Sequence, residues 1–461
     1  MSTSLAHGVI DLARAYRAEE TTAHETVQAL LQRIEALDPK LGAFQSVYPD
    51  DALEAGAAAD SARMAGHEIG PFHGIPFALK DVIDVAGRMT TGGSMTTAKK
   101  TAARTSEVAR RLIAAGGILI GKTKTIEFSM GGWGVNQHLG TPRNPWDPHT
   151  HRVAGGSSSG SAVAVSADMV PVALGTDTGG SVRNPSAWCG VVGLKTTHGS
   201  LPMDGIIPTA YSLDTVGPIT RSVADAAFMF DLMKGAEPAN LYRHVECKRG
   251  IANGKEESLR GLRVGVLPHR EREGMQTSVL DLYDHALHRL RSTSAEIEVF
   301  EPPMTYIELA HANREIATAE AYTHHGALME DADAQVDEDV RQLILPGRAV
   351  SARDYIAARL QRQQNIQTFL DRLRGFDALL TPTLGMTPVP LDEVQPRDYP
   401  AGFTRPVNYL AMCALTVPMG LTPDGLPGGL QFIARGGEEA TALRIGRAYE
   451  TVRGKLERPP V

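Results

Sequence analysis

The sequence predicts one large α/β domain that spans residues 1–461. Patterns typical of helices and of strands alternate from end to end, and no Pro- or Ser-rich linker divides the chain. A length of 461 residues would also accommodate two units, but the missing linker favours one. Hydrophobic residues make up 42% of the chain and charged residues 21%, which is typical of a globular protein.

Helices are predicted where apolar residues recur every three or four positions between capping and breaking residues. Thr22 and Glu25 form a capping box ahead of an apolar stripe, and Pro39 is expected to end this helix at about Leu37. Further helices are predicted at 51–64, 105–115, 159–167, 279–292, 306–329, 352–373 and 439–453.

Strands are predicted for the short apolar runs at 75–83, 118–120, 169–174, 262–267, 376–382 and 415–419. The first of these runs contains a lysine, Lys80, that its apolar neighbours would bury. The structural explanation is an ion pair with Asp81 or Asp84. The functional explanation is a general base, because burial lowers the pKa of a lysine from about 10.4 toward neutrality.

Two Gly-Gly-Ser clusters flank the helix predicted at 159–167, and they end at Ser157 and Ser181. A serine hydroxyl attacks a carbonyl carbon only when a base removes its proton. Glycines allow a substrate to approach the backbone closely. Taken alone, the first cluster could instead be a flexible loop, and the second is as compatible with an ordinary turn as with a functional one.

Residues 116–123 match the Walker A phosphate loop letter for letter. The context is wrong, however, because a helix precedes the motif and the apolar strand predicted at 118–120 occupies its middle. A phosphate loop follows a strand and opens a helix. Nucleotide binding is therefore disfavoured.

Residues 156–160 match the nucleophile elbow of α/β-hydrolases, with Ser158 as the nucleophile. That fold needs an acidic residue and then a histidine later in the chain. Asp377 is an acidic candidate, but the last histidines are His324 and His325, which precede it. The order of these residues argues against the elbow.

The composition disfavours several classes of partner. The net charge is −7 and no basic block is present, so no nucleic-acid partner is expected. Neither a signal peptide nor an apolar run of roughly 18 residues occurs, so no membrane partner is expected. Three cysteines, Cys189, Cys247 and Cys413, fit a reducing, cytoplasmic compartment. The pair His149 and His151 lacks further ligands, so no metal is expected.

Read together, several segments resemble the amidase signature family of amide hydrolases. The matching segments follow the family's order between about residue 5 and about residue 450, and they are 74–81, 175–183, 190–195, 213–218, 380–383 and 424–431. Each segment alone is a weak signal, but their combination in one order is specific. The resemblance implies a single amidase domain with a mixed central β-sheet that helices cover on both faces.

The family uses a Ser–cis-Ser–Lys triad. On this chain the resemblance implies that Ser181 is the nucleophile, Ser157 the middle serine and Lys80 the general base. It also implies that the developing oxyanion is stabilised by the backbone N–H groups of Thr178, Gly179, Gly180 and Ser181. No metal and no organic cofactor are implied.

Further candidates border this triad. Trp133 lies in a Gly-rich loop and is equally a candidate pocket residue and a packed aromatic. The resemblance implies that Asp177 and Arg183 brace the nucleophile's loop, and Arg183 is also a candidate for binding a substrate carboxylate. Residues from about 235 to 375 are the least recognisable, and the resemblance implies that they form lids and pocket walls.

The predicted reaction is hydrolysis of a small-molecule amide through an acyl-enzyme on Ser181. One alternative is a carbamate (urethane) or ester hydrolase that uses the same triad. A second is the glutaminase-type subunit of an amidotransferase complex that acts on mischarged tRNA. A third is a nucleotide-binding module at 116–123. The sequence leaves open whether the protein forms a homodimer.

Overall fold

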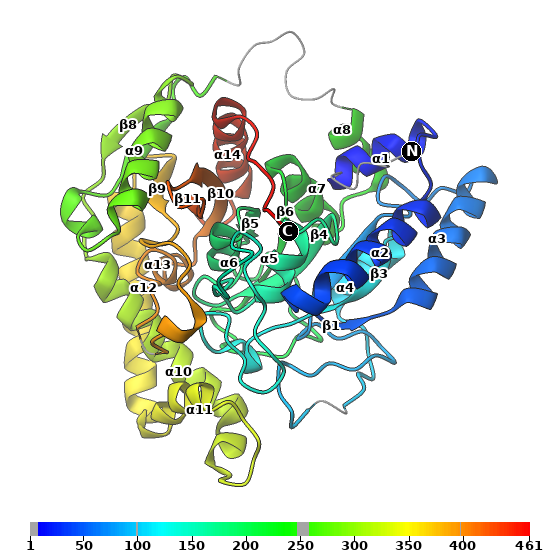
Figure 1. The fold of residues 1–461 in the computed structure, drawn as a ribbon. Coiled ribbons are helices and arrows are strands. Elements are labelled where there is room, and N and C mark those ends of the chain that lie inside the picture. The colour runs from blue at the N-terminus through cyan, green and yellow to red at the C-terminus, as the bar shows by residue number, and fades with distance from the viewer. Residues whose placement is uncertain (1–7, 98–99, 247–257, 397) are drawn as a thin grey trace.

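One mixed sheet of 11 strands runs through the molecule (Figure 1), in the order β1-β3-β2-β4-β6-β5-β10-β11-β9-β7-β8. The computed structural model describes residues 8–97, 100–246, 258–396 and 398–461. The strands are β1 (Phe44–Val47), β2 (Pro76–Lys80), β3 (Ile118–Thr123), β4 (Val172–Asp177), β5 (Val192–Lys195), β6 (Thr215–Thr220), β7 (Arg263–Val266), β8 (Glu296–Val299), β9 (Ala378–Pro382), β10 (Cys413–Leu421) and β11 (Pro427–Ala434).

The sheet contains a parallel group of strands toward each end and antiparallel strands between the two groups, and the edge strand β1 is antiparallel to its neighbour β3. Strands β3, β2 and β4 are parallel neighbours, and so are β9, β7 and β8. All neighbouring pairs from β4 through β6, β5, β10 and β11 to β9 are antiparallel. The sheet is therefore mixed, as the family resemblance implies.

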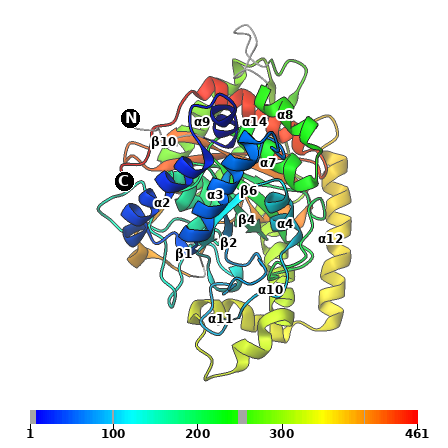
Figure 2. The same ribbon diagram turned by 90° about the vertical axis from the view of Figure 1, so that its right-hand side faces the viewer.

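Helices lie on both sides of the sheet (Figure 2). They are α1 (Val9–Arg17), α2 (Ala23–Leu41), α3 (Pro49–Met64), α4 (Glu107–Ala114), α5 (Ser159–Ser166), α6 (Arg183–Trp188), α7 (Val223–Lys234), α8 (Pro238–Glu246), α9 (Thr277–Arg291), α10 (Tyr306–Glu330), α11 (Glu338–Ile344), α12 (Ala352–Arg372), α13 (Arg405–Tyr409) and α14 (Glu439–Arg453). Four short 3-10 turns are η1 (Glu127–Ser129), η2 (His269–Arg272), η3 (Leu345–Ala349) and η4 (Leu391–Glu393).

Three groups of helices are distinguished by their contacts. Helix α14 contacts α7 and α9, and all three helices contact strands in the antiparallel part of the sheet. Helices α5 and α6 contact each other. Helix α5 contacts β2, β3, β4 and β6, and α6 contacts β5, β10 and β11. Helices α10, α11 and α12 extend beyond the sheet at the bottom of both views (Figures 1 and 2). This architecture confirms the predicted single α/β domain.

Several predicted boundaries differ from the structure. Helix α2 continues through Pro39 to Leu41, because a proline in the last turn removes only one N–H donor, and Gly42 ends the helix with φ +62°. Strand β2 ends at Lys80, because the next residues turn and the amides of Val82 and Ile83 both donate to the Lys80 carbonyl. The patterns did not predict α1, α6, α7, α8, α11, α13, β1, β5, β6, β8 and β11.

Helix α5 is buried on every side, which explains its composition of serine, glycine, alanine and valine. At Gly160, a Cβ atom would lie 2.2 Å from the carbonyl oxygen of Ala43 and 2.5 Å from the amide nitrogen of Lys124. Only glycine therefore permits this approach of the helix to the neighbouring chain. The close packing places the start of α5, and with it Ser157, beside the ends of β2 and β4.

The described residues carry no signal of a membrane span or a metal site. None of their helices combines the length and apolarity needed to cross a membrane. Within the same residues, no group of three or more His, Cys, Asp or Glu is arranged to hold a metal ion. Cys189 and Cys413 are buried free thiols, and Cys247 lies outside the described residues.

The segment that matches the Walker A motif has a structural role. Residues Gly121, Lys122 and Thr123 belong to β3, and the Lys122 side chain is fully buried. Its ammonium group lies 2.9 Å from Asp81 Oδ1 and also donates to Thr90 Oγ1. A lysine held in this way does not reach a phosphate in solvent, which argues against the nucleotide-binding alternative.

We expect Lys122→Ala to lower the free energy of unfolding by about 3 to 5 kcal/mol, because it leaves the Asp81 carboxylate buried without its counter-charge. Urea denaturation measures the change. The matched control is Arg374→Ala, which removes a solvent-exposed ion pair with Asp371 and should leave the unfolding midpoint nearly unchanged. Equal midpoints for Lys122→Ala and the wild type would show that the buried pair does not stabilise the fold.

Candidate active site

The candidate site lies where β2 and β4 end. These strands are parallel neighbours, so their carboxyl ends meet at the same edge of the sheet. Lys80 is the last residue of β2, and Thr176 is the penultimate residue of β4. Ser157 lies just ahead of α5, and Ser181 lies in the turn between β4 and α6. The fold thus brings together residues that are about 100 positions apart.

The Lys80 amine is fully buried and lies 2.7 Å from Ser157 Oγ and 2.8 Å from Thr176 Oγ1. Among the described residues it forms no ion pair, and Asp81 is paired with Lys122 instead. The structural explanation for a buried Lys80, an ion pair with Asp81 or Asp84, is therefore wrong.

Burial lowers the pKa of Lys80 to about 7, although Asp214 and Asp177 oppose the shift. The Lys80 amine donates hydrogen bonds to Ser157 Oγ and to Thr176 Oγ1. In its neutral form the amine also has a lone pair that can accept a proton. The short distance to Ser157 and the lowered pKa make Lys80 a candidate general base near neutral pH.

The two Gly-Gly-Ser clusters lie side by side. The peptide bond between Gly156 and Ser157 is cis, as the resemblance implies. The amide of Ser158 donates to the carbonyl oxygen of Ser181 at 3.2 Å, which joins the two clusters. The Ser158 hydroxyl is buried and bonds the backbone of Thr176, so it is not the exposed nucleophile that an elbow requires.

Ser181 lines a cavity of about 70 Å³. Among the described residues its hydroxyl has no hydrogen-bond partner, so it is available to a substrate. Gly180 has φ +131°, and a Cβ atom there would lie 2.3 Å from Asn184 Nδ2 and 2.5 Å from Thr404 Oγ1. Glycine is therefore required for the turn that presents Ser181.

The structure corrects one member of the predicted oxyanion hole. The amide of Gly180 donates to Asp177 Oδ1 at 2.8 Å, so it is already engaged. The amides of Thr178, Gly179 and Ser181 have no acceptor within the described part of the chain. These three N–H groups remain as candidates for an oxyanion.

Asp177 and Arg183 form a buried ion pair at 2.8 Å. Burial opposes the charge on Asp177, but Arg183 outweighs this and holds the carboxyl pKa below its usual range. Every N–H of the Arg183 guanidinium is used, by Asp177, Thr404, Asn408 and Gln431. Arg183 therefore braces the loop and has no donor left for a substrate carboxylate, which argues against that predicted contact.

Trp133 packs into an aromatic cluster and does not line the cavity beside Ser181. Its ring centroid lies 5.7 Å from that of Trp188 and 5.2 Å from that of Tyr399, and its indole N–H donates to the Gln395 carbonyl. The preceding residues Gly131 and Gly132 do line the cavity. The structure thus favours the packing interpretation of Trp133.

Several residues at this site were not predicted from the sequence. Thr176 lies within the matching segment 175–183, and its place at a strand end could have indicated a contact with Lys80. The Thr178 hydroxyl donates to Asp214, and burial raises the pKa of that carboxyl to about 6. The lining residues Asn313 and Arg405 belong to no motif, so no local signal identified them.

The mixed sheet and the buried Lys80–Ser157 pair are features of amide hydrolases with a Ser–Ser–Lys triad. Comparison of the sequence with family profiles agrees, because the Amidase profile matches residues 25–443. The chain belongs to the amidase signature family.

Relatives and solved structures extend this result. The A subunit of glutamyl-tRNA(Gln) amidotransferase from Chloroflexus aurantiacus is 36% identical over 476 residues, with 97% of each chain covered. The structure resembles that of peptide amidase from Stenotrophomonas maltophilia, with a TM-score of 0.82, 32% identity and coverage of 100% of this chain and 99% of that one. An amidase crystal structure has a TM-score of 0.86 at 29% identity and covers 97% of this chain and 100% of that chain.

We expect inactivation by phenylmethylsulfonyl fluoride to follow the protonation of Lys80. The neutral amine is the reactive form, so the rate should rise about tenfold per pH unit below pH 7 and level off above it. Residual esterase activity or mass spectrometry of the labelled protein measures the rate. Ser181→Ala should block labelling, and a rate that stays constant between pH 5 and 9 would exclude Lys80 as the base.

Proposed function

We propose that the protein hydrolyses the C–N bond of a small-molecule linear amide through an acyl-enzyme on Ser181. The observation that carries this proposal is the buried Lys80 amine, which lies 2.7 Å from Ser157 Oγ and has a pKa of about 7. It adjoins a serine that faces a cavity. A serine becomes nucleophilic when a neighbouring base accepts its proton.

In the first step, Ser181 Oγ attacks the carbonyl carbon of the amide. Its proton moves to Ser157, and the proton of Ser157 moves to the neutral Lys80 amine. The free amides of Thr178, Gly179 and Ser181 stabilise the oxyanion. Each such donor typically contributes about 2.7–4 kcal/mol to the transition state.

In the second step, the C–N bond breaks and the proton returns from Lys80 through Ser157 to the leaving amine. A water molecule then attacks the ester of Ser181, and the same base accepts its proton. The products are a carboxylic acid and an amine, and the serine is regenerated. No other group is needed to balance the reaction.

We further propose that the segment 235–375 selects the substrate. Helix α10 supplies Asn313, Arg314 and Ala317 to the wall of the cavity beside Ser181, and Leu343 of α11 lines it too. These helices belong to the part of the chain with the weakest resemblance to the family's motifs. Substrate preference would then differ between relatives that share the same triad.

A second candidate is a glutaminase-type subunit of an amidotransferase complex. The observation that favours it is the similarity to the A subunit of glutamyl-tRNA(Gln) amidotransferase from several organisms, including Chloroflexus aurantiacus at 36% and Geobacter metallireducens at 35% identity. Glutamine hydrolysis would use the same Ser181 chemistry. Carbamate and ester hydrolysis are likewise compatible with the triad.

We expect a hydrolysis panel of aliphatic amides, aryl amides, esters, carbamates and glutamine to identify at least one substrate. In Ser181→Ala and Lys80→Ala its turnover should fall at least about a thousandfold, because each change removes one part of a unit that acts together. The matched control is Ser61→Ala, which changes an exposed serine on α3 and should leave kcat unchanged. Turnover that survives Ser181→Ala would exclude the proposed nucleophile.

The two candidates differ in their need for partners. A small-molecule amidase should be active as the purified chain and should not prefer glutamine. An amidotransferase subunit should co-purify with other subunits from its source and should hydrolyse glutamine appreciably only with them. Affinity purification followed by mass spectrometry and a glutaminase assay separates these outcomes.

A further inference from the structure

Two arginines line the cavity that contains Ser181. Arg314 projects from α10, and Arg405 is the first residue of α13. Within the described part of the chain, neither guanidinium group forms an ion pair or a side-chain hydrogen bond. A cation of this kind in a concave site is a candidate for binding an anion.

Arg405 lies directly beside the nucleophile's turn. A Cβ atom on Gly179 would lie 3.1 Å from Arg405 Cγ and 3.9 Å from its Nε. Gly179 is two residues from Ser181 and supplies one of the three free amides. A group bound by Arg405 would therefore lie close to the reacting carbonyl.

The wall of this cavity is positively charged. Among the described residues that line it are two arginines and no aspartate or glutamate. Burial, together with the nearby charge of Arg314, lowers the pKa of Arg405 to about 10, so the group stays charged at neutral pH while its charge is unfavourable. The Ser129 hydroxyl is also buried at this wall, without a hydrogen-bond partner in the described structure. An anion would satisfy these groups together.

The two arginines also border a second, larger cavity. This outer cavity has a volume of about 720 Å³ and shares Arg314, Tyr399 and Arg405 with the inner one. The outer wall is mixed in charge, because Glu271, Glu273 and Asp398 line it beside Arg270, which pairs with Glu301. The positive charge of Arg314 and Arg405 is thus concentrated where the outer cavity meets the catalytic one.

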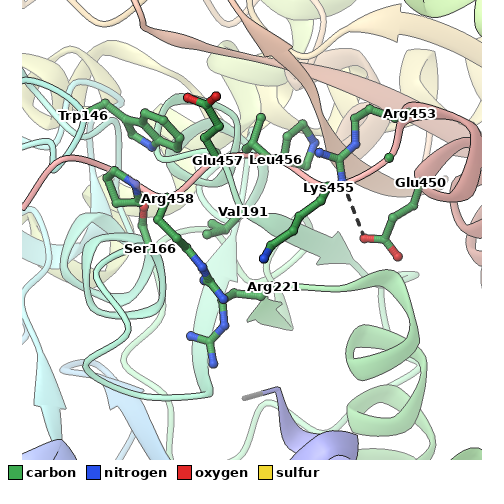
Figure 3. A pocket seen from close by; sticks show the side chains of 14 residues that line it. Trp146, Ser166, Val191, Arg221, Glu450, Arg453, Lys455, Leu456, Glu457 and Arg458 are labelled. Carbon is green, nitrogen blue, oxygen red and sulfur yellow. Dashed lines mark ion pairs between the residues drawn. The ribbon is translucent and has the colours of Figure 1, made fainter. Parts of the chain in front are cut away.

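A second group of arginines, near the carboxyl terminus, forms ion pairs with acidic side chains. Figure 3 shows a cavity near the carboxyl terminus that Arg221, Arg453 and Arg458 line. Arg221 and Arg458 lie 2.9 Å and 2.7 Å from Asp168, and Arg453 pairs with Glu450. Acidic side chains neutralise that group, whereas the described lining of the cavity at Ser181 contains no acidic side chain.

We propose that the substrate is an amide that carries a carboxylate, and that Arg405 and Arg314 bind this carboxylate beside Ser181. This inference rests on the proposed amidase function. A guanidinium group donates two parallel N–H bonds to a carboxylate, which would orient the amide carbonyl toward Ser181. The carboxylate belongs either to the acyl part, as in a monoamide of a dicarboxylic acid, or to the amine part, as in an N-acyl amino acid.

The test compares kcat/KM for matched amides that differ only in the carboxylate. The acyl-side pair is the monoamide of succinic acid and succinic diamide. The amine-side pair is N-acetylglycine and N-isobutylacetamide. We expect the acid of at least one pair to be the better substrate, and Arg405→Leu to lower its kcat/KM by about 10- to 100-fold, as expected for loss of a charged hydrogen bond. The neutral partner should change by less than about threefold.

Three further variants complete the design. Arg405→Lys should restore part of the activity toward the acid, because it retains the charge but not the fork of donors. Arg314→Leu should also lower kcat/KM for the acid substrate. This variant replaces Arg405→Leu in the test if Arg405→Leu does not fold. Arg270→Gln is the matched control, because this outer-cavity arginine is already paired with Glu301. The control variant should leave kcat/KM for both the acidic and the neutral amide unchanged.

Binding is measured separately in Ser181→Ala, by calorimetry with succinate as the probe. Succinate should bind Ser181→Ala and should bind the double variant with Arg405→Leu at least about tenfold more weakly. Failure of the wild type to hydrolyse any amide, with succinate binding intact, would contradict the proposed function and leave the carboxylate site standing. Equal losses for acidic and neutral amides in Arg405→Leu, or no binding of succinate, would overturn the carboxylate site.

Discussion

The candidate active site depends on the buried ion pair between Asp177 and Arg183. Isolating either charge in the interior is costly, and the pair is tolerated because all of its hydrogen-bonding groups find partners. Arg183 reaches α13 and β11 through Asn408 and Gln431, so the turn that carries Ser181 is fixed to the far part of the sheet. By accepting the Gly180 amide, Asp177 also determines which neighbouring amides stay free for an oxyanion.

Burial has the opposite consequence at Lys80. No carboxylate of the described residues contacts the Lys80 amine, so no ion pair offsets the loss of hydration. Burial therefore lowers the pKa of Lys80 to about 7. Lys122, on the adjacent strand, is equally buried but has Asp81 at 2.9 Å. Lys80 and Lys122 thus have different roles, because Lys122 has a counter-ion and Lys80 has two hydroxyl groups.

Local patterns predicted some elements with both ends correct and placed the ends of others wrongly. The closing helix was predicted at 439–453 and is α14 (Glu439–Arg453), since a long apolar stripe needs no tertiary information. Strand β4 was predicted too early in the chain and runs through Asp177, because pairing with β6 continues beyond the apolar run. Similarly, a Walker A match was misleading by itself, and only the surrounding strand pattern revealed it as part of β3.

The sequence by itself predicted the α/β class, and its family resemblance singled out Lys80, Ser157 and Ser181 as candidates, because several short segments match the family's motifs in one order. Only the tertiary structure decided which groups remain free around them. All donors of Arg183 are used, some of them by residues far away in the chain such as Gln431. Arg405 lies more than 200 positions after Ser181, lines the same cavity and has no counter-ion among the described residues. Such availability depends on every neighbour in space, and a pattern along the chain does not contain it.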